Sequence, residues 1–394
     1  MTRLTPAGPT PAGPTPAGPV GPDDAMRIAL AASARVHGTT SPNPPVGCVV
    51  LAADGTVAGV GATAPPGGPH AEVVALAQAG ERARGGTAVV TLEPCAHHGR
   101  TPPCTDALRA AGIAAVHVAV ADPNPVAAGG AEALRAAGLT VTVGTLAPDI
   151  VDAVAAGPLR AWLHAQRTGR PHVTWKFAAT LDGRSAAADG TSRWITGPAA
   201  RARVHTLRAT SDAVVVGTGT ALADDPALTA RDVDGTPLAR QPLRVVAGLR
   251  DVAPGSHLDA PDVLHVRTHD PDEVIAALHA RGVVDVLLEG GPRLAGAFLA
   301  AGRVDRVLAH VAPALLGAGA AALGDAGVGT IGDILRLHVA RVELVGGDIL
   351  IDALVGAAPG AAAPAGAADG QVVATVSAPR PADRSGSTPD GSGP

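Results

Sequence analysis

Two cysteines and two histidines lie close together in the segment Glu93-Pro-Cys95-Ala-His97-His98-Gly-Arg-Thr-Pro-Pro-Cys104. An apolar run over 87–92 precedes this segment, and an alanine-rich stretch with helical periodicity, 105–111, follows it. We therefore expect the segment to join the carboxyl end of a strand to the start of a helix, which is where α/β folds bind their ligands. A second junction of this kind is His70-Ala-Glu72, which follows the Pro- and Gly-rich loop 64–69 and opens another predicted helix.

The sequence around these junctions alternates short apolar runs with alanine-rich segments. This pattern predicts a layered α/β sheet. We expect strands at 46–51, 57–60, 87–92, 116–121 and 140–143, and helices at 71–78, 105–111 and 130–137.

The residues at the two junctions match a catalytic zinc site. One histidine and two cysteines, His70, Cys95 and Cys104, supply three ligands and leave the fourth position to water. Glu72 is the carboxylate placed to take and return protons. Taken singly, a His-x-Glu pair is more often a solvated helix start and a lone cysteine a small core residue.

The other histidines and the third cysteine of this region need a separate interpretation. His97 and His98 are alternative ligands, although we favour a role beside the substrate or behind the ligands. Cys48 lies inside a strand run and is predicted to be buried.

The order of these motifs is similar to that of the cytidine-deaminase superfamily, whose nucleobase members carry His-x-Glu followed by Pro-Cys-x-x-Cys. Here eight residues separate Cys95 from Cys104. That spacing, with Pro-Asn-Pro-Pro-Val-Gly-Cys at 42–48 and Asp-Pro-Asn-Pro at 122–125, resembles the deaminase half of the bifunctional RibD family of riboflavin biosynthesis, over 23 to about 145.

The resemblance implies zinc on His70, Cys95 and Cys104, a proton shuttle at Glu72, and a hydrogen bond from Asn43 to the substrate. The implied reaction is hydrolytic deamination of 2,5-diamino-6-ribosylamino-4(3H)-pyrimidinone 5′-phosphate, which releases ammonia. The implied fold is a cytidine-deaminase-like three-layer α/β/α domain. The chain departs from the family at 126–130, where a lysine between two glycines is missing.

A second α/β pattern begins near residue 171. We expect strands at 172–177, 213–217, 243–247, 263–266, 284–289 and 306–311, and a closing hairpin of 335–344 with 348–351 around Gly346-Gly347. Lys176, the only lysine of the chain, lies in this part, between Trp175 and Phe177. A lysine after a strand is ordinarily a solvated charge, but arginine fills every other cationic position here, which favours a role for Lys176 as a compact ammonium donor.

Two glycine-rich segments in this half follow predicted strands. They cover 217–229 and 289–296, and their backbone amides could receive a phosphate, although such segments are more often only turns. With the segment around Lys176, they resemble the second half of the RibD family, a reductase with a dihydrofolate-reductase-like α/β fold, over 171 to about 353.

The resemblance implies NADPH-dependent reduction of the ribosylamino group to a ribitylamino group. The implied cofactor contacts are Ala179, Trp194, Thr220, Asp224, Gly291, Pro292, Arg293, Leu294, Ala295, Gly296 and Ala297. The implied substrate contacts are Lys176, Ser192, Arg208, Leu228, Arg231 and Glu289, with the arginines pairing with the 5′-phosphate. After 243–246 the family usually continues with Asp-Ser, whose serine helps to hold the cofactor, and here the chain reads Ala247-Gly-Leu-Arg250.

The distribution of Gly and Pro along the chain indicates the domain organisation. The 394 residues include 50 Gly and 36 Pro, concentrated at both ends, where Thr-Pro-Ala-Gly-Pro occurs three times from Thr5. We predict disordered tails at 1–22 and 356–394, a deaminase domain at 23–147, a connecting helix or linker at 148–170 and a reductase domain at 171–355.

Charge and cysteine content exclude several classes of protein. The net charge is −5, and the sequence contains neither a basic run nor a segment long enough to cross a membrane. These features argue against a nucleic-acid base deaminase, which would also carry Cys-x-x-Cys spacing. Three cysteines do not make a disulfide framework, so we expect a cytoplasmic protein, and the family resemblance suggests a homo-oligomer. A structural zinc module with four protein ligands is the remaining alternative.

Overall fold

The computed structural model describes residues 18–97 and 102–356. Nearly all of the two predicted tails lies outside these residues, as does His98, one of the alternative ligands.

The first half of the chain forms a five-stranded mixed sheet with the order β2-β1-β3-β4-β5. Its central strand β3 pairs in parallel with β4 and antiparallel with β1, and β5 extends the parallel part. Both β1 and β3 are almost entirely buried, as expected for apolar strands covered on two faces. The strands are β1 (Gly47–Leu51), β2 (Val57–Ala62), β3 (Thr87–Leu92), β4 (Ala115–Val120) and β5 (Thr140–Val143).

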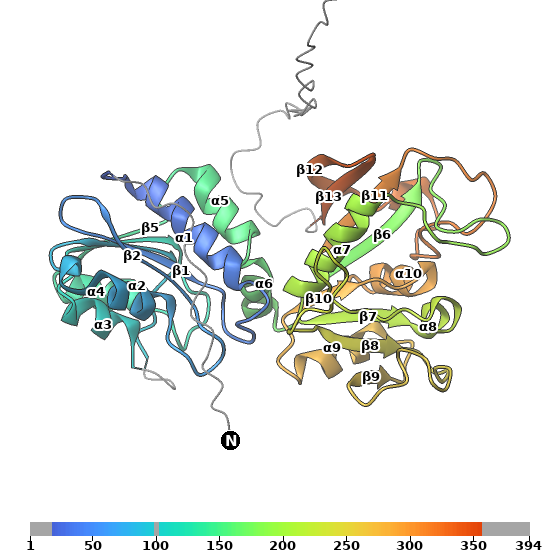
Figure 1. Cartoon of the computed structure of the whole chain (residues 1–394), viewed down its shortest axis with the longest axis horizontal. Helices are drawn as coiled ribbons and strands as arrows, with labels where there is room; N and C mark the ends of the chain where they lie inside the picture. The colour runs from blue at the N-terminus through green and yellow to red at the C-terminus, as the bar shows by residue number, and fades with distance from the viewer. Residues whose placement is uncertain (1–17, 98–101, 357–394) are drawn as a thin grey trace, which may run out of the picture. The chain divides into compact units, whose positions relative to one another are not determined.

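Helices cover both faces of this sheet and complete a three-layer α/β/α domain (Figure 1). On one face lie α1 (Pro22–Val36) and α5 (Pro148–Ala156), and on the other lie α2 (Ala71–Ala79), α3 (Cys104–Ala110) and α4 (Gly130–Ala136), with the short η1 (Gly80–Ala83) after α2. The layers pack closely because small residues face each other. A Cβ added at Gly47 on β1 would lie 1.9 Å from the Ala29 carbonyl oxygen of α1, so only glycine fits there.

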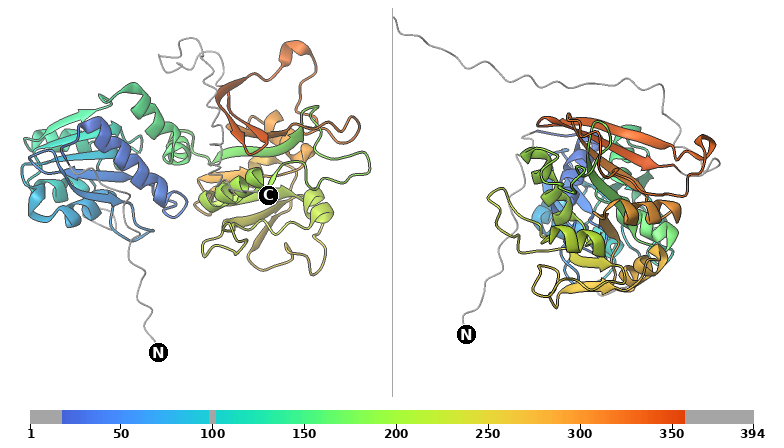
Figure 2. Two further views of the ribbon diagram at one scale, coloured as in Figure 1. Left: turned by 45° about the horizontal axis from the view of Figure 1, so that its top comes forward. Right: turned by 90° about the vertical axis from the view of Figure 1, so that its right-hand side faces the viewer.

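The second half forms an eight-stranded sheet with the order β12-β13-β11-β6-β10-β7-β8-β9. The six strands from β11 to β9 run parallel, and the antiparallel hairpin β12–β13 forms one edge (Figure 2). The strands are β6 (His172–Thr180), β7 (Ala213–Gly217), β8 (Leu243–Ala247), β9 (Val263–Val266), β10 (Asp285–Leu288), β11 (Arg306–Ala312), β12 (Leu337–Val345) and β13 (Asp348–Val355).

Apolar side chains fill the space on both faces of this sheet. Alternate residues of a strand enter different cores: Val215 packs with Phe298 of α10, and Val214 packs with Ala221 of α8. The remaining elements are α6 (Arg160–Thr168), α7 (Pro198–Thr210), α8 (Thr218–Asp224), α9 (Pro271–His279), α10 (Pro292–Ala300) and η2 (Ile331–Asp333). The carboxyl ends of the parallel strands therefore meet at one edge, where α8 and α10 begin.

The predicted strands and the closing hairpin are confirmed, with ends that differ by a few residues. Helix α1 was not predicted, although its buried residues Ala25, Met26, Ala29, Ala32 and Ser33 recur at helical spacing, because it directly follows the Pro- and Gly-rich segment that we assigned to a tail. Its first residue, Pro22, belongs to the predicted tail 1–22. Among the described residues, no helix is both long and apolar enough to span a bilayer.

Candidate functional site

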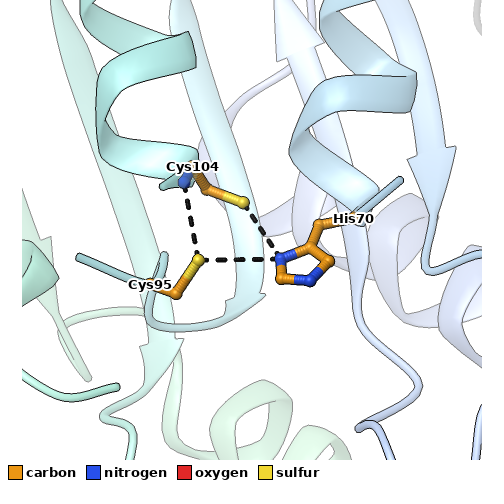
Figure 3. A group of neighbouring side chains, drawn as sticks. All are labelled: His70, Cys95 and Cys104. Atoms are coloured by element: carbon orange, nitrogen blue, oxygen red, sulfur yellow. Dashed lines mark hydrogen bonds between the residues drawn. The ribbon is translucent and has the colours of Figure 1, made fainter. Parts of the chain in front are cut away.

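Three predicted ligands lie together where β3 ends and α2 and α3 begin (Figure 3). The His70 Nδ1 atom lies 3.2 Å from Cys104 Sγ and 3.6 Å from Cys95 Sγ, and all three ligand atoms lie within 4.8 Å of one another. Zinc bonds of ~2.1 Å to nitrogen and ~2.3 Å to sulfur in a tetrahedron imply nitrogen–sulfur separations of about 3.6 Å. The three side chains therefore fit a zinc ion.

Short-range structure places each ligand. His70 is the N-cap residue of α2, and Cys104 is the first residue of α3. Cys95 follows β3, and its carbonyl accepts a hydrogen bond from the Thr105 amide at 3.3 Å, while its sulfur accepts one from the Cys104 amide at 3.5 Å. These two bonds hold the start of α3 against Cys95.

The buried carboxylate of Glu93 anchors this end of the sheet. It accepts hydrogen bonds from the Asp122 amide at 3.0 Å and from the Ala131 amide, in the first turn of α4, at 2.8 Å. Glu93 thereby connects the end of β3 to the loop after β4 and to α4. This role of Glu93 was not predicted from the sequence, because a carboxylate that binds backbone amides has no distinctive spacing.

The two thiols influence each other strongly. The hydrogen bond from Cys104 lowers the pKa of Cys95 to about 4, with a further contribution from His70. The same bond raises the pKa of Cys104 far above its ordinary value. A divalent cation bound by both cysteines would take them as thiolates and displace their protons.

Glu72 lies in the first turn of α2, two residues after His70, and is buried. Burial raises the pKa of its carboxyl above the ordinary value, while a hydrogen bond with Cys104 opposes that shift. A carboxylate beside a cation site with a raised pKa can accept a proton and return it near neutral pH.

The other predicted residues of this half take different positions. Cys48 is fully buried in β1, as predicted, and burial raises its pKa. His97 does not belong to the described ligand cluster, and its Nδ1 atom is buried without a hydrogen-bond partner among the described residues. Asn43 is half-buried in a turn held by Thr40, whose hydroxyl donates to the Asn43 carbonyl at 2.9 Å.

A cavity of about 1760 Å³ lies at the carboxyl edge of the second sheet. This volume exceeds the ~300–1,000 Å³ of ordinary small-molecule pockets, so it has room for a dinucleotide and a second ligand together. Most predicted contacts line it: Lys176, Ser192, Trp194, Arg208, Thr220, Asp224, Leu228, Arg231, Glu289, Gly291, Pro292, Arg293, Leu294 and Ala297. Ala179, Ala295 and Gly296 are buried beside it and do not line it.

The charged floor of this cavity is made by Lys176, Arg208 and Glu289. Burial lowers the pKa of the Lys176 ammonium, and the negative charge of Glu289 opposes that shift. Arg208 donates to both oxygens of Glu289, at 2.7 and 2.9 Å, and to the Thr229 carbonyl at 3.2 Å. Three of its five N–H groups therefore already donate within the protein, and the predicted pairing of Arg208 with a substrate phosphate stays a prediction.

Loops hold the rim of the cavity. The Gly291 amide donates to Thr220 Oγ1 at 3.1 Å, which ties the loop before α10 to α8. Trp194 is 70% exposed, with the Arg201 guanidinium 4.6 Å from its ring centre. An exposed aromatic ring at a cavity rim offers a surface on which a planar ligand can stack.

One lining residue, His310 of β11, was not found from the sequence. It is almost fully buried, neither ring nitrogen has a hydrogen-bond partner among the described residues, and burial lowers its pKa to about 4. Its register partner is Ala178 of β6, so it shares a face with Lys176. A histidine within an apolar strand gives no sequence signal that separates a cavity residue from a core residue.

Comparisons with known proteins agree with both halves. Residues 22–120 match the model of the cytidine and deoxycytidylate deaminase zinc-binding region, and residues 171–351 match that of the RibD C-terminal domain. The chain is 56% identical over 331 residues to the riboflavin biosynthesis protein RibD of Mycobacterium tuberculosis, covering 84% of this chain and 96% of the relative. It is 40% identical over 368 residues to that of Escherichia coli, covering 84% and 98%.

Two solved structures of related proteins align with most of this chain. Acinetobacter baumannii RibD aligns with a TM-score of 0.76 at 37% identity, over 85% of this chain and 99% of that one. A diaminohydroxyphosphoribosylaminopyrimidine deaminase and 5-amino-6-(5-phosphoribosylamino)uracil reductase from Thermotoga maritima aligns with a TM-score of 0.75 at 31% identity, over 85% and 99%.

Proposed function

Because the chain belongs to the RibD family and is a bifunctional deaminase and reductase of riboflavin biosynthesis, we propose which of its residues carry each reaction. The fold class is the expected one, a cytidine-deaminase-like domain followed by a dihydrofolate-reductase-like domain. The cofactors follow from the two family models and the ligand cluster: zinc for the deaminase, and NADPH for the reductase.

In the deaminase domain, His70, Cys95 and Cys104 would hold zinc and Glu72 would transfer protons. When bound, zinc supplies the Lewis acidity that brings the pKa of water close to neutrality. Glu72 accepts a proton as water attacks the carbon that carries the exocyclic amine. Glu72 returns this proton to the ring nitrogen and then transfers the second proton of the water, from the new hydroxyl, to the amine, so that the C–N bond breaks, ammonia leaves and a carbonyl remains. The raised pKa of Glu72 supports both halves of this cycle. We assign the substrate hydrogen bond to Asn43.

In the reductase domain, we propose that Lys176, Glu289 and Arg208 form the floor against which the ribosylamino group is held. NADPH supplies the hydride that reduces C1 of the sugar. As the bond between C1 and the ring oxygen breaks, the Lys176 ammonium would donate a proton to that oxygen, which becomes a hydroxyl. Arg208 holds Glu289 in place, and Glu289 supports the positive charge of Lys176. Ser192, Leu228 and Arg231 complete the proposed substrate contacts.

The cofactor is assigned to the rim of the same cavity. We propose contacts from Trp194, Thr220, Asp224 and the segment from Gly291 into the first turns of α10, where Gly291 to Leu294 and Ala297 line the cavity. The bond between Gly291 and Thr220 supports this, because it holds two of these segments together at the cavity. Ala179, Ala295 and Gly296, which were also predicted, are buried outside this lining.

The observation that carries the proposal is the convergence of His70, Cys95 and Cys104 on one point beside buried Glu72. A single assay tests both activities: ammonia release and NADPH oxidation are followed separately with the diaminopyrimidinone ribosyl phosphate as substrate. We expect ammonia release without NADPH and NADPH oxidation only after deamination. NADPH oxidation without ammonia release would contradict the proposed order of the reactions.

The predicted domain limits are 23–147 and 171–355, joined by 148–170; because α5 (Pro148–Ala156) packs in the first core, we propose that the deaminase domain extends through α5. We also propose a reducing, cytoplasmic location, because three free cysteines include two at the zinc site. We also propose a homo-oligomer. In its support, the edge strand β12 exposes Leu337, Val339, Val342 and Leu344. Light scattering should give a mass above that of one chain, and Val339→Lys should lower it.

A further inference from the structure

Arg250 is a cation of the reductase cavity that has no protein acceptor. The cavity arginines Arg193, Arg201, Arg208 and Arg231 all donate hydrogen bonds to protein oxygens. Within 18–97 and 102–356, Arg250 and Arg293 donate none. The carboxylate next to Arg250 in the chain, that of Asp251, is already paired with Arg267. The positive charge of Arg250 is therefore left for a ligand.

The backbone before Arg250 is fixed rather than free. The Gly248 amide donates to the Val266 carbonyl at 3.1 Å, the His265 Nε2 atom donates to the Gly248 carbonyl at 2.8 Å, and Arg267 donates to the Leu249 carbonyl at 3.2 Å. Gly248 has φ +132°, which only glycine adopts without strain, and a Cβ there would lie 2.7 Å from Thr218 Oγ1.

This turn places the guanidinium against the start of α8. The Arg250 Nη2 atom lies 3.6 Å from the position that a Cβ of Gly219 would occupy. Gly219 and Thr218 both line the cavity, so the guanidinium borders the same space as the proposed cofactor contact Thr220.

The position along the sheet sets which part of a dinucleotide Arg250 can reach. Lys176 lies on β6, and β8 is three strands away in the order β6-β10-β7-β8. At ~4.8 Å between strands, the two are separated by about 14 Å along the carboxyl edge. With the reacting end of the cofactor beside Lys176, an extended dinucleotide brings its adenosine half to β8.

We infer that Arg250 binds the 2′-phosphate of NADPH and thereby selects NADPH over NADH. The inference rests on the proposed reductase function. An arginine near the adenosine ribose is the group that accommodates a 2′-phosphate in dinucleotide-binding α/β sheets, and a guanidinium can donate two parallel hydrogen bonds to phosphate oxygens.

Calorimetric binding of two nucleotide fragments to the full chain tests this without turnover. The probes are adenosine 2′,5′-bisphosphate and adenosine 5′-monophosphate, which differ only in the 2′-phosphate. The wild-type chain should bind the bisphosphate more tightly. Arg250→Ala should weaken bisphosphate binding roughly ten- to hundredfold and change monophosphate binding less than about twofold. Arg250→Lys should retain part of the preference, because an ammonium keeps the charge but loses the fork.

Two other arginine variants are controls. Arg281→Ala removes an exposed arginine from the loop after α9, away from the cavity, and should leave both affinities unchanged. Arg293 lies at the start of α10, where a pyrophosphate would bind, so Arg293→Ala should weaken the binding of both nucleotides to the same extent.

Equal binding of both probes by the wild-type chain would overturn the assignment, as would an unchanged preference in Arg250→Ala or a selective loss in Arg293→Ala. An absence of NADPH oxidation in the wild-type assay would instead count against the proposed reductase function.

Discussion

Arg208 and Glu289 face each other across the floor of the reductase cavity in a two-pronged ion pair, with Nε–Oε1 at 2.7 Å and Nη2–Oε2 at 2.9 Å. Both side chains are largely buried, at 15% and 10% exposure. Burial alone would raise the pKa of Glu289, but the Arg208 guanidinium and the Lys176 ammonium hold it below the ordinary value. The carboxylate therefore remains charged and balances two cations.

Glu289→Gln should damage both stability and reduction, because it keeps the side-chain shape but removes the charge opposite Arg208 and Lys176. Breaking one side of a buried pair costs about 3–5 kcal/mol, which urea unfolding at pH 7 would measure. The double variant Arg208→Gln with Glu289→Gln should recover part of that loss, because no unpaired guanidinium remains. A double variant as unstable as the sum of the single variants would contradict the pairing argument.

Cys104→Ser should lower the zinc content. Metal analysis of purified wild-type chain should give about one zinc per chain, and the variant should lose most of it, because a hydroxyl replaces the thiolate that completes the triad with His70 and Cys95. Cys48→Ser is the matched control: this cysteine is buried in β1, outside the triad, and its replacement should leave the zinc content unchanged. Full zinc in Cys104→Ser would remove Cys104 from the ligand set.

Glu72→Gln should keep zinc and lose ammonia release. The amide retains the size of the buried side chain but cannot accept a proton from water, so turnover should fall by at least ~10²-fold. When the already deaminated pyrimidine is supplied as substrate, the rate of NADPH oxidation should stay at the wild-type value. A variant that releases ammonia at the wild-type rate would exclude Glu72 as the acid–base group.

Most strands of the fold could be predicted from runs of apolar residues in the sequence. The run 213–217 is apolar without interruption, which is typical of parallel strands covered on both faces, and 243–247 departs from this only at Arg244; both strands were predicted to the residue. Helix α1 was not predicted, although Ala25, Ala29 and Ala32 recur at helical spacing, because it follows the Pro- and Gly-rich stretch assigned to a tail, and its close packing on β1 at Gly47 is not visible in the sequence.

Some site residues could likewise be predicted from the sequence, and others could not. His70, Cys95 and Cys104 were predictable because metal ligands leave spaced, chemically distinct residues in the sequence. The roles of Glu93 and His310 arise from burial and from distant partners, which the sequence does not show. The Arg208–Glu289 pair joins residues that are 81 positions apart, so its internal pairing could not be separated from phosphate binding before the structure was known.

Lys176→Met should leave deamination intact and slow NADPH oxidation by roughly 10²-fold or more, since the methionine fills the space but donates no hydrogen bond. Lys176→Arg tests the requirement for a compact ammonium: a guanidinium keeps the charge beside Glu289 but does not fit a site shaped for lysine, so oxidation should recover only in part. Oxidation at the wild-type rate in Lys176→Met would show that the lysine is not part of the reductase machinery.

The buried imidazole of His310 should make stability depend on pH. Burial lowers its pKa to about 4 from an ordinary value of 6.5, so between these values the unfolded chain binds a proton that the folded chain does not. Stability is therefore complete above pH 6.5 and falls as the pH drops toward 4. His310→Leu removes this titration and the two unpartnered ring nitrogens, so its stability should fall less than that of the wild-type chain over the same interval. Urea unfolding at pH 4.5, 5.5, 6.5 and 7.5 measures the difference.

The matched variant His338→Leu, at an exposed position of β12, should give a curve of stability against pH that is parallel to that of the wild-type chain. Parallel curves for His310→Leu and the wild-type chain would mean that His310 does not carry this dependence.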